Sequence, residues 1–144
     1  MHRALWIGRV LSALAVLFLT FDATMKLLRL PMAIDGTTEL GYPASVVFPL
    51  GIVQVVCLIL YLLPRTSVFG AVLWTGYLGG AIATHVRLGN PLFTHVLFPV
   101  YVALLLWGGL WLRDTRLRAL LPLYHRPGGS GLRQIRGKVQ HDSR

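Results

Sequence analysis

Residues 44–63 read ASVVFPLGIVQVVCLILYLL, a run of twenty positions without a single charged side chain. At a helical rise of about 1.5 Å per residue, this run is about 30 Å long, which matches the hydrocarbon thickness of a bilayer. Three further apolar runs, at about residues 4–28, 67–86 and 91–112, have a similar length. Barrel strands alternate apolar and polar residues, and these runs do not. The sequence therefore predicts an all-α membrane protein with four transmembrane helices.

The composition agrees with this class. Hydrophobic residues make up 55% of the 144 residues and charged residues only 13%, whereas soluble domains contain about 25% charged residues. The single cysteine, Cys57, excludes a disulfide scaffold and thiol–disulfide exchange. The N-terminal run resembles a signal peptide, but it contains Asp22 and Lys26 and has no A-x-A site, so we expect it to remain as the first span.

The connections between the runs are short. Pro31–Leu40 fits a short interfacial helix, the segment Pro64–Ser67 fits a tight loop with Ser67 as a helix cap, and Gly89–Pro91 fits a turn. Connections this short join antiparallel neighbours, so we expect an up-down-up-down four-helix bundle.

The net charge of +9 is concentrated after the last apolar run, from Arg113 to Arg144. A basic segment beside a span indicates topology and contact with anionic lipid headgroups, and no nucleic-acid-binding motif accompanies it. The positive-inside rule then predicts that both termini are cytoplasmic. We expect a transmembrane domain over residues 1–122, a basic flexible tail over 123–144, and no nucleic-acid partner.

Small residues predict where helices pack closely. Gly8, Ser12, Ala15 and Leu19 form one seam on the first span. In the third span, Gly76, Gly80 and Thr84 form a small-xxx-small ridge, which predicts that Gly80 packs against another helix.

Ionisable residues inside the spans are the candidate site, because burying them in lipid costs several kcal/mol unless they are paired or hydrated. Three spans place such residues near one end of the bundle, and two more lie in the adjoining loops: Asp22, Lys26, His85 and His95, with Arg87 and Glu39. We expect the first four to line one outward-facing cavity, with the last two at its mouth. The alternative is that each group is satisfied locally, as in an ion pair between Asp22 and Lys26, which lie four residues apart on one helix face. Spacing alone does not establish a haem or a metal, and we predict no metal site.

Several segments of the chain carry a family resemblance: residues 22–26 (DATMK), 40–43 (LGYP), 60–66 (LYLLPRT), 75–80 (TGYLGG) and 83–87 (ATHVR), followed by Phe98-Pro99. Together they resemble the DoxX-like family over about residues 6–122. The resemblance implies a four-helix bundle in the bacterial inner membrane. Named relatives include a subunit of a thiosulfate:quinone oxidoreductase, and others are tied to membrane redox complexes.

Two functional hypotheses remain open, and neither establishes an enzyme. In the first, the outward-facing pocket binds a small amphiphile such as a quinone, and the chain is an accessory of a membrane redox complex. In the second, the chain is a non-catalytic membrane subunit or assembly factor whose polar cluster is structural. Both allow membrane protein partners or a homo-oligomer. A transporter is a weaker third reading, because no inverted repeat or broken mid-membrane helix is visible.

Overall fold

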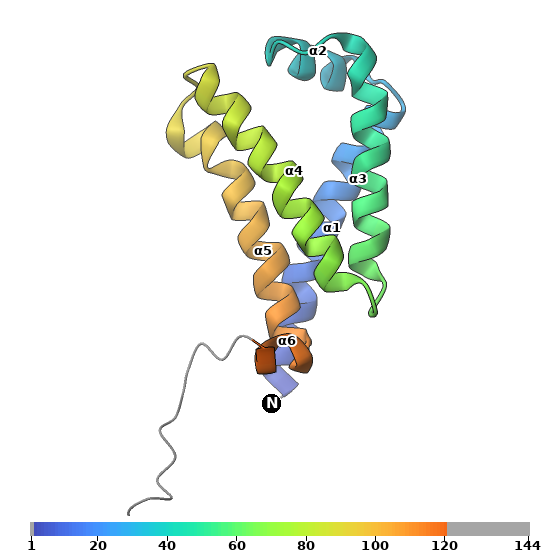
Figure 1. The fold of residues 1–144 in the computed structure, drawn as a ribbon, viewed down its shortest axis with the longest axis vertical. Helices are drawn as coiled ribbons and strands as arrows, with labels where there is room; N and C mark the ends of the chain where they lie inside the picture. The colour runs from blue at the N-terminus through green and yellow to red at the C-terminus, as the bar shows by residue number, and fades with distance from the viewer. Residues whose placement is uncertain (1, 121–144) are drawn as a thin grey trace, which may run out of the picture.

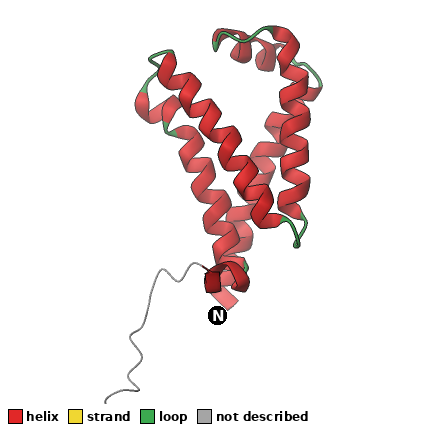
Figure 2. Ribbon diagram, in the orientation of Figure 1, coloured by secondary structure: helices red, strands yellow, loops and turns green. Residues whose placement is uncertain are grey.

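The computed structural model describes residues 2–120, and this part of the chain is built from helices and contains no strand (Figures 1 and 2). The predicted all-α class is therefore confirmed. The elements, in chain order, are α1 (His2–Leu27), α2 (Pro31–Glu39), η1 (Ala44–Val46), α3 (Val47–Leu62), α4 (Ser67–Arg87), η2 (Leu92–Val96), α5 (Phe98–Arg113) and α6 (Thr115–Leu120). The predicted tail over residues 123–144 lies outside the described residues.

Four helical stretches are long and apolar enough to cross a membrane: Arg3–Leu27, Ala44–Leu62, Ser67–Arg87 and Leu92–Arg113. No end of these stretches differs from the predicted position by more than one residue. Helix α6 was not expected from the sequence. Its first turn is capped by the Asp114 carboxylate, which accepts a hydrogen bond from the backbone N–H of Arg116 at 2.8 Å.

The connections follow the expected turn chemistry, with one correction. Pro31 begins α2 after an extended Leu30, which confirms the short helix between the first two spans. Gly89, with φ +68°, ends α4 in the left-handed region. The prediction that Ser67 caps α4 is wrong, because Thr66 occupies the cap position without a side-chain cap bond. The Ser67 hydroxyl instead points back into the tight loop, toward the Pro64 carbonyl at 3.5 Å.

The fourth span is not one continuous helix. It begins as the π-helix η2, and the α-helix α5 starts only at Phe98. Pro99, in the first turn of α5, has no N–H to donate to the carbonyl of His95, four residues earlier. The proline therefore explains why the segment holding His95 departs from α-helical geometry.

Helix α1 packs against α3 and α5, and α4 packs against the same two helices. Figure 1 shows α3 and α4 close together at their connecting loop and separated toward α2. We call the extremity of the bundle with α2 and η2 the α2 end, and the opposite extremity, with α6 and the N-terminus, the α6 end. The seam predicted on α1 is buried: Gly8, Ser12, Ala15 and Leu19.

Close helix contact depends on Gly8, which lies in the predicted seam of α1, and on Gly109, which was not predicted. A Cβ atom on Gly109 would lie 2.8 Å from the backbone nitrogen of Ser12, and one on Gly8 would lie 2.7 Å from Leu112 Cβ. On α4, by contrast, a Cβ on Gly76 or Gly80 would meet no atom within 4 Å. The prediction that Gly80 packs against another helix is therefore wrong: Gly76 and Gly80 are exposed, although Thr84, which completes the ridge, is buried.

Candidate functional site

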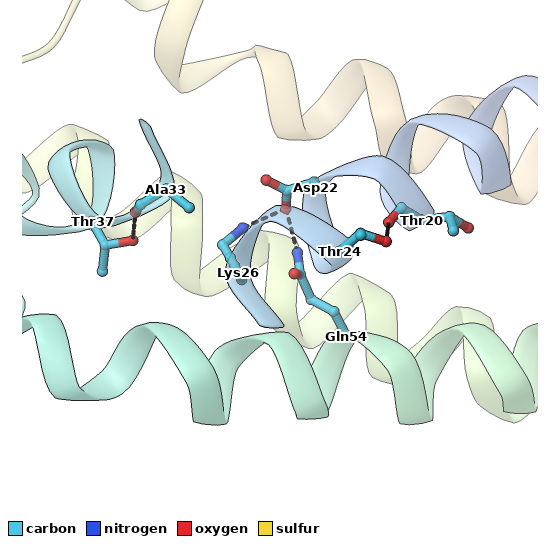
Figure 3. Close-up of polar contacts among 7 residues, drawn as sticks. All are labelled: Thr20, Asp22, Thr24, Lys26, Ala33, Thr37 and Gln54. Atoms are coloured by element: carbon cyan, nitrogen blue, oxygen red, sulfur yellow. Dashed lines mark hydrogen bonds and ion pairs between the residues drawn. The ribbon is translucent and has the colours of Figure 1, made fainter. Parts of the chain in front are cut away.

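A carboxylate, an ammonium group and an amide meet between α1 and α3. Figure 3 shows that Lys26 Nζ and Gln54 Nε2 both approach the same oxygen of Asp22. Lys26 reaches it from one helical turn away on α1, and Gln54 Nε2 donates from α3 at 2.5 Å. The predicted Asp22–Lys26 ion pair is thus present, and Gln54 forms the interhelical bond that tethers it to α3. We call Asp22, Lys26 and Gln54 the Asp22 cluster.

A glycine allows this arrangement to form. A Cβ atom on Gly51 would lie 3.0 Å from the Leu27 nitrogen and 3.1 Å from Lys26 Cβ, so a larger residue would push α3 and α1 slightly apart. The close approach places Gln54, one turn farther along α3, within reach of the carboxylate.

The Asp22 cluster contains one buried acceptor that has no hydrogen-bond donor. Gln54 is 1% exposed, and its Oε1 atom has no hydrogen-bond partner among residues 2–120. The amide orientation is fixed, because a carboxylate accepts only from the NH₂ side. A buried acceptor without a donor costs about 1–3 kcal/mol. A donor from water or from a ligand would remove that cost.

The two histidines meet at the α2 end. The rings of His85, on α4, and His95, on η2, pack edge to face with centroids 5.7 Å apart. Asn90 Nδ2 lies 2.9 Å from His85 Nδ1. Because an amide nitrogen only donates, His85 Nδ1 accepts and the ring proton lies on Nε2. His95 Nδ1 pairs with the neighbouring hydroxyl of Thr94 at 2.8 Å. Within residues 2–120, neither Nε2 atom makes a hydrogen bond. We call His85 and His95 the histidine pair.

Side-chain hydrogen bonds link the loop after α2 to α4. The Thr84 hydroxyl donates to the Gly80 carbonyl at 2.9 Å, so it accepts from the Tyr42 hydroxyl, also at 2.9 Å. Arg87 donates to the Leu40 carbonyl at 3.1 Å. Arg87 therefore lies against the chain segment that follows Glu39. The Glu39 side chain is exposed and makes no ion pair within the described residues.

The six predicted site residues thus lie in three places: two side-chain pairs, and a contact between α4 and the loop after α2. Asp22 and Lys26 are bonded to each other, His85 packs on His95, and Arg87 reaches the loop beside Glu39. No hydrogen bond or ion pair among residues 2–120 joins the Asp22 cluster to the histidine pair. A single cavity lined by all four spanning residues stays a prediction.

Sequence reasoning left three participants out of the site. Gln54 lies in the middle of an uncharged run, and its polarity there is the signal that could have marked it. Tyr42 and Thr84 gave no such signal, since tyrosine is common at membrane interfaces and threonine bonds its own helix.

The described residues contain no group of three or more His, Cys, Asp and Glu side chains that could hold a metal ion. The side chains at this end offer hydrogen-bonding groups and charges. The donors are the Lys26 ammonium and the His85 Nε2–H, and the acceptors are the Asp22 carboxylate and Gln54 Oε1.

Comparison with curated proteins and with solved structures gave no match. A comparison with protein families matches residues 10–109, a range that includes every residue of the Asp22 cluster and of the histidine pair. Together with the four membrane-spanning stretches, this match shows that the chain is a membrane protein that belongs to the DoxX-like family.

Proposed function

We propose that the chain binds a small amphiphile with a hydrogen-bonding head, of which a quinone is the leading candidate, at the α2 end of the bundle. In this proposal the chain is an accessory of a redox complex in the bacterial inner membrane, and partner subunits supply the electrons. The observation that carries the proposal is the buried, unpartnered Oε1 of Gln54 beside a carboxylate inside a membrane span.

The available groups match the two forms of such a head. A quinone carbonyl accepts hydrogen bonds, and the Lys26 ammonium retains donors beyond the one it gives to Asp22. A quinol hydroxyl donates, and Gln54 Oε1 is an acceptor without a donor. The Asp22 cluster therefore offers a hydrogen-bond partner to either the quinone or the quinol.

The histidine pair contributes a second donor. Because Asn90 holds Nδ1 of His85, the Nε2–H is free to donate to a carbonyl oxygen. The apolar part of the ligand would lie along the membrane-facing surface of the helices, where large apolar side chains such as Phe93 are exposed.

A ligand-retention assay tests this proposal. The full-length protein is purified in mild detergent with added long-chain quinone, and the bound quinone is measured by mass spectrometry of the lipid extract. We expect Gln54→Leu and His85→Ala to retain much less quinone than the natural chain. Thr75→Val is the matched control, because it removes a hydroxyl that bonds Trp107 elsewhere in the membrane region.

Equal retention by all variants, or no retention by the correctly folded natural chain, would refute quinone binding. A melting curve of each variant separates loss of ligand from loss of fold.

A second candidate function has its own supporting observation. On α4 a Cβ atom at Gly76, Gly79 or Gly80 would meet no atom within 4 Å, so this stretch of α4 presents small, exposed residues. Small residues of this kind let another transmembrane helix approach closely. This surface favours a non-catalytic membrane subunit, an assembly factor or a homo-oligomer. In that case the Asp22 cluster would be a structural tether between α1 and α3.

The two candidates differ in their response to one change. Gly79→Leu should break the helix contact and shift the oligomeric state, measured by native mass spectrometry, while quinone retention stays unchanged. If Gly79→Leu leaves the oligomeric state unchanged, the glycine surface has no such role.

A further inference from the structure

A second candidate binding site lies at the opposite extremity of the bundle from the Asp22 cluster. A pocket of about 520 Å³ opens at the α6 end, where α1, the loop between α3 and α4, the end of α5 and the start of α6 meet. Its walls carry four arginines and one acid: Arg9, Arg65, Arg113, Arg116 and Asp114.

The charge of this pocket is unbalanced. The Asp114 carboxylate accepts hydrogen bonds from the backbone of α6, at 2.8 Å from the Arg116 nitrogen. Within residues 2–120 the only ion pair is that of Asp22 and Lys26, so none of the four guanidinium groups has a carboxylate partner there. Guanidinium groups brought together from different segments repel one another unless an anion lies between them.

The fold positions at least one of these arginines firmly. The Arg113 guanidinium lies 5.0 Å from the centre of the Tyr61 ring, and Tyr61 is fully buried. The Tyr61 hydroxyl is in turn held by Ser12 at 3.1 Å and by the Leu106 carbonyl at 2.8 Å. A charge held on a buried aromatic ring is an ordered part of the pocket wall.

The pocket also has an apolar side that is continuous with the membrane surface. Leu5, Leu62 and Leu110 line it, and Leu62 is 54% exposed on the outer surface of α3. The spanning stretches end at Leu62 and Arg113, so the pocket lies at the depth where a bilayer changes from hydrocarbon to headgroups. A ligand here meets arginines with one part and apolar side chains with another.

We propose that this pocket binds the phosphate of an anionic phospholipid, with the acyl chains lying against the exposed apolar residues beside it. Guanidinium groups form paired hydrogen bonds with phosphate oxygens, which a compact ammonium group does not. Basic pockets between transmembrane helices are suited to lipid headgroups of this charge. The exposed side chains available to the acyl chains include Trp6 and Leu63.

Native mass spectrometry of the full-length protein tests the proposal. The protein is released from bilayers of phosphatidylcholine alone or with added phosphatidylglycerol, and the bound lipid is counted. We expect phosphatidylglycerol to remain bound, and Arg9→Gln and Arg65→Gln each to weaken its retention roughly tenfold, as expected for a lost charge-assisted hydrogen bond.

Arg3→Gln is the matched control. Arg3 lies on α1 near the same end and carries the same charge, but it does not line the pocket. If Arg3→Gln weakens retention as much as Arg9→Gln does, the attraction is diffuse and the pocket proposal is wrong. Melting curves in pure phosphatidylcholine verify that the variants fold.

Inorganic phosphate distinguishes the two sources of the same anion. We expect millimolar phosphate to leave the bound phosphatidylglycerol in place, because phosphate makes no contact with the apolar wall. Complete displacement by phosphate would show that the pocket recognises the free anion, and the lipid proposal would fail. Equal retention of phosphatidylcholine and phosphatidylglycerol would also overturn it.

Discussion

Replacing Gly109 with alanine should separate α1 from α5 and destabilise the whole bundle. The added Cβ atom would lie 2.8 Å from the Ser12 nitrogen and 3.0 Å from the Gly8 carbonyl oxygen, and it would overlap the Ser12 hydroxyl. The nitrogen and the carbonyl oxygen belong to the backbone of α1, so no side-chain rotation relieves the contact. The two helices must move apart along the most extensive interface in the molecule.

The size of the effect follows from three contributions. Overpacking of this kind costs about 1–3 kcal/mol. Moving Ser12 also strains its 3.1 Å hydrogen bond to Tyr61, which is worth about 1 kcal/mol. Alanine returns up to about 1 kcal/mol because it favours a helix more than glycine does. The expected loss in the free energy of unfolding is therefore about 1–3 kcal/mol.

Gly80→Ala is the matched control, since its Cβ atom would meet nothing within 4 Å. It should leave the stability unchanged or raise it by up to about 1 kcal/mol. Both variants are unfolded in the same mixed micelles with increasing sodium dodecyl sulfate, and helix content is followed by circular dichroism. If Gly109→Ala proves as stable as Gly80→Ala, the close α1–α5 contact and the reasoning based on it are refuted.

Three further predictions concern the ion pair, the core and the topology. Lys26→Met should lower stability more than the double variant Asp22→Asn with Lys26→Met, because the single change leaves a carboxylate unpaired inside a span; equal losses would contradict this. Tyr61→Phe should lower the free energy of unfolding by about 1–2 kcal/mol, because the hydroxyl makes two buried hydrogen bonds, and an unchanged unfolding curve would disprove their contribution. Reporter fusions after Arg29 and after Gly89 should both report the outside, and a cytoplasmic signal at both positions would reverse the predicted topology.

The spans could be predicted closely because their limits depend on local chemistry. A proline or a glycine follows each of the first three runs, and each run has the length that a bilayer requires. The Asp22–Lys26 pair was predictable for the same reason, since residues four apart on a helix face one another. These are properties of one segment and do not depend on its neighbours.

Contacts between helices were harder to predict. Gly80 has the small-xxx-small spacing of a packing ridge, yet Gly109 is the glycine that packs closely against the predicted seam of α1. Spacing identifies a smooth surface on a helix, but it does not tell whether that surface faces the bundle or faces outward. The break in the fourth span was missed because Pro99 was assigned to the interior of a helix, where its missing N–H matters most.

Helix α4 is held less tightly at the α2 end than at the loop that connects it to α3. Near their connecting loop, α3 and α4 touch through backbone atoms, since a Cβ on Gly70 would lie 2.7 Å from Tyr61 Cα. At the α2 end, side-chain hydrogen bonds link α4 to the loop after α2: Tyr42 to Thr84, and Arg87 to the Leu40 carbonyl. Each such bond contributes only about 1 kcal/mol net, because a competing donor or acceptor can replace it. Separating α3 from α4 at their loop would instead expose packed apolar side chains, including the fully buried Trp74, at a cost of several kcal/mol. In the proposed function, a ligand with a hydrogen-bonding head would therefore exchange with the Tyr42 and Arg87 contacts, whereas α3 and α4 stay in contact at their loop.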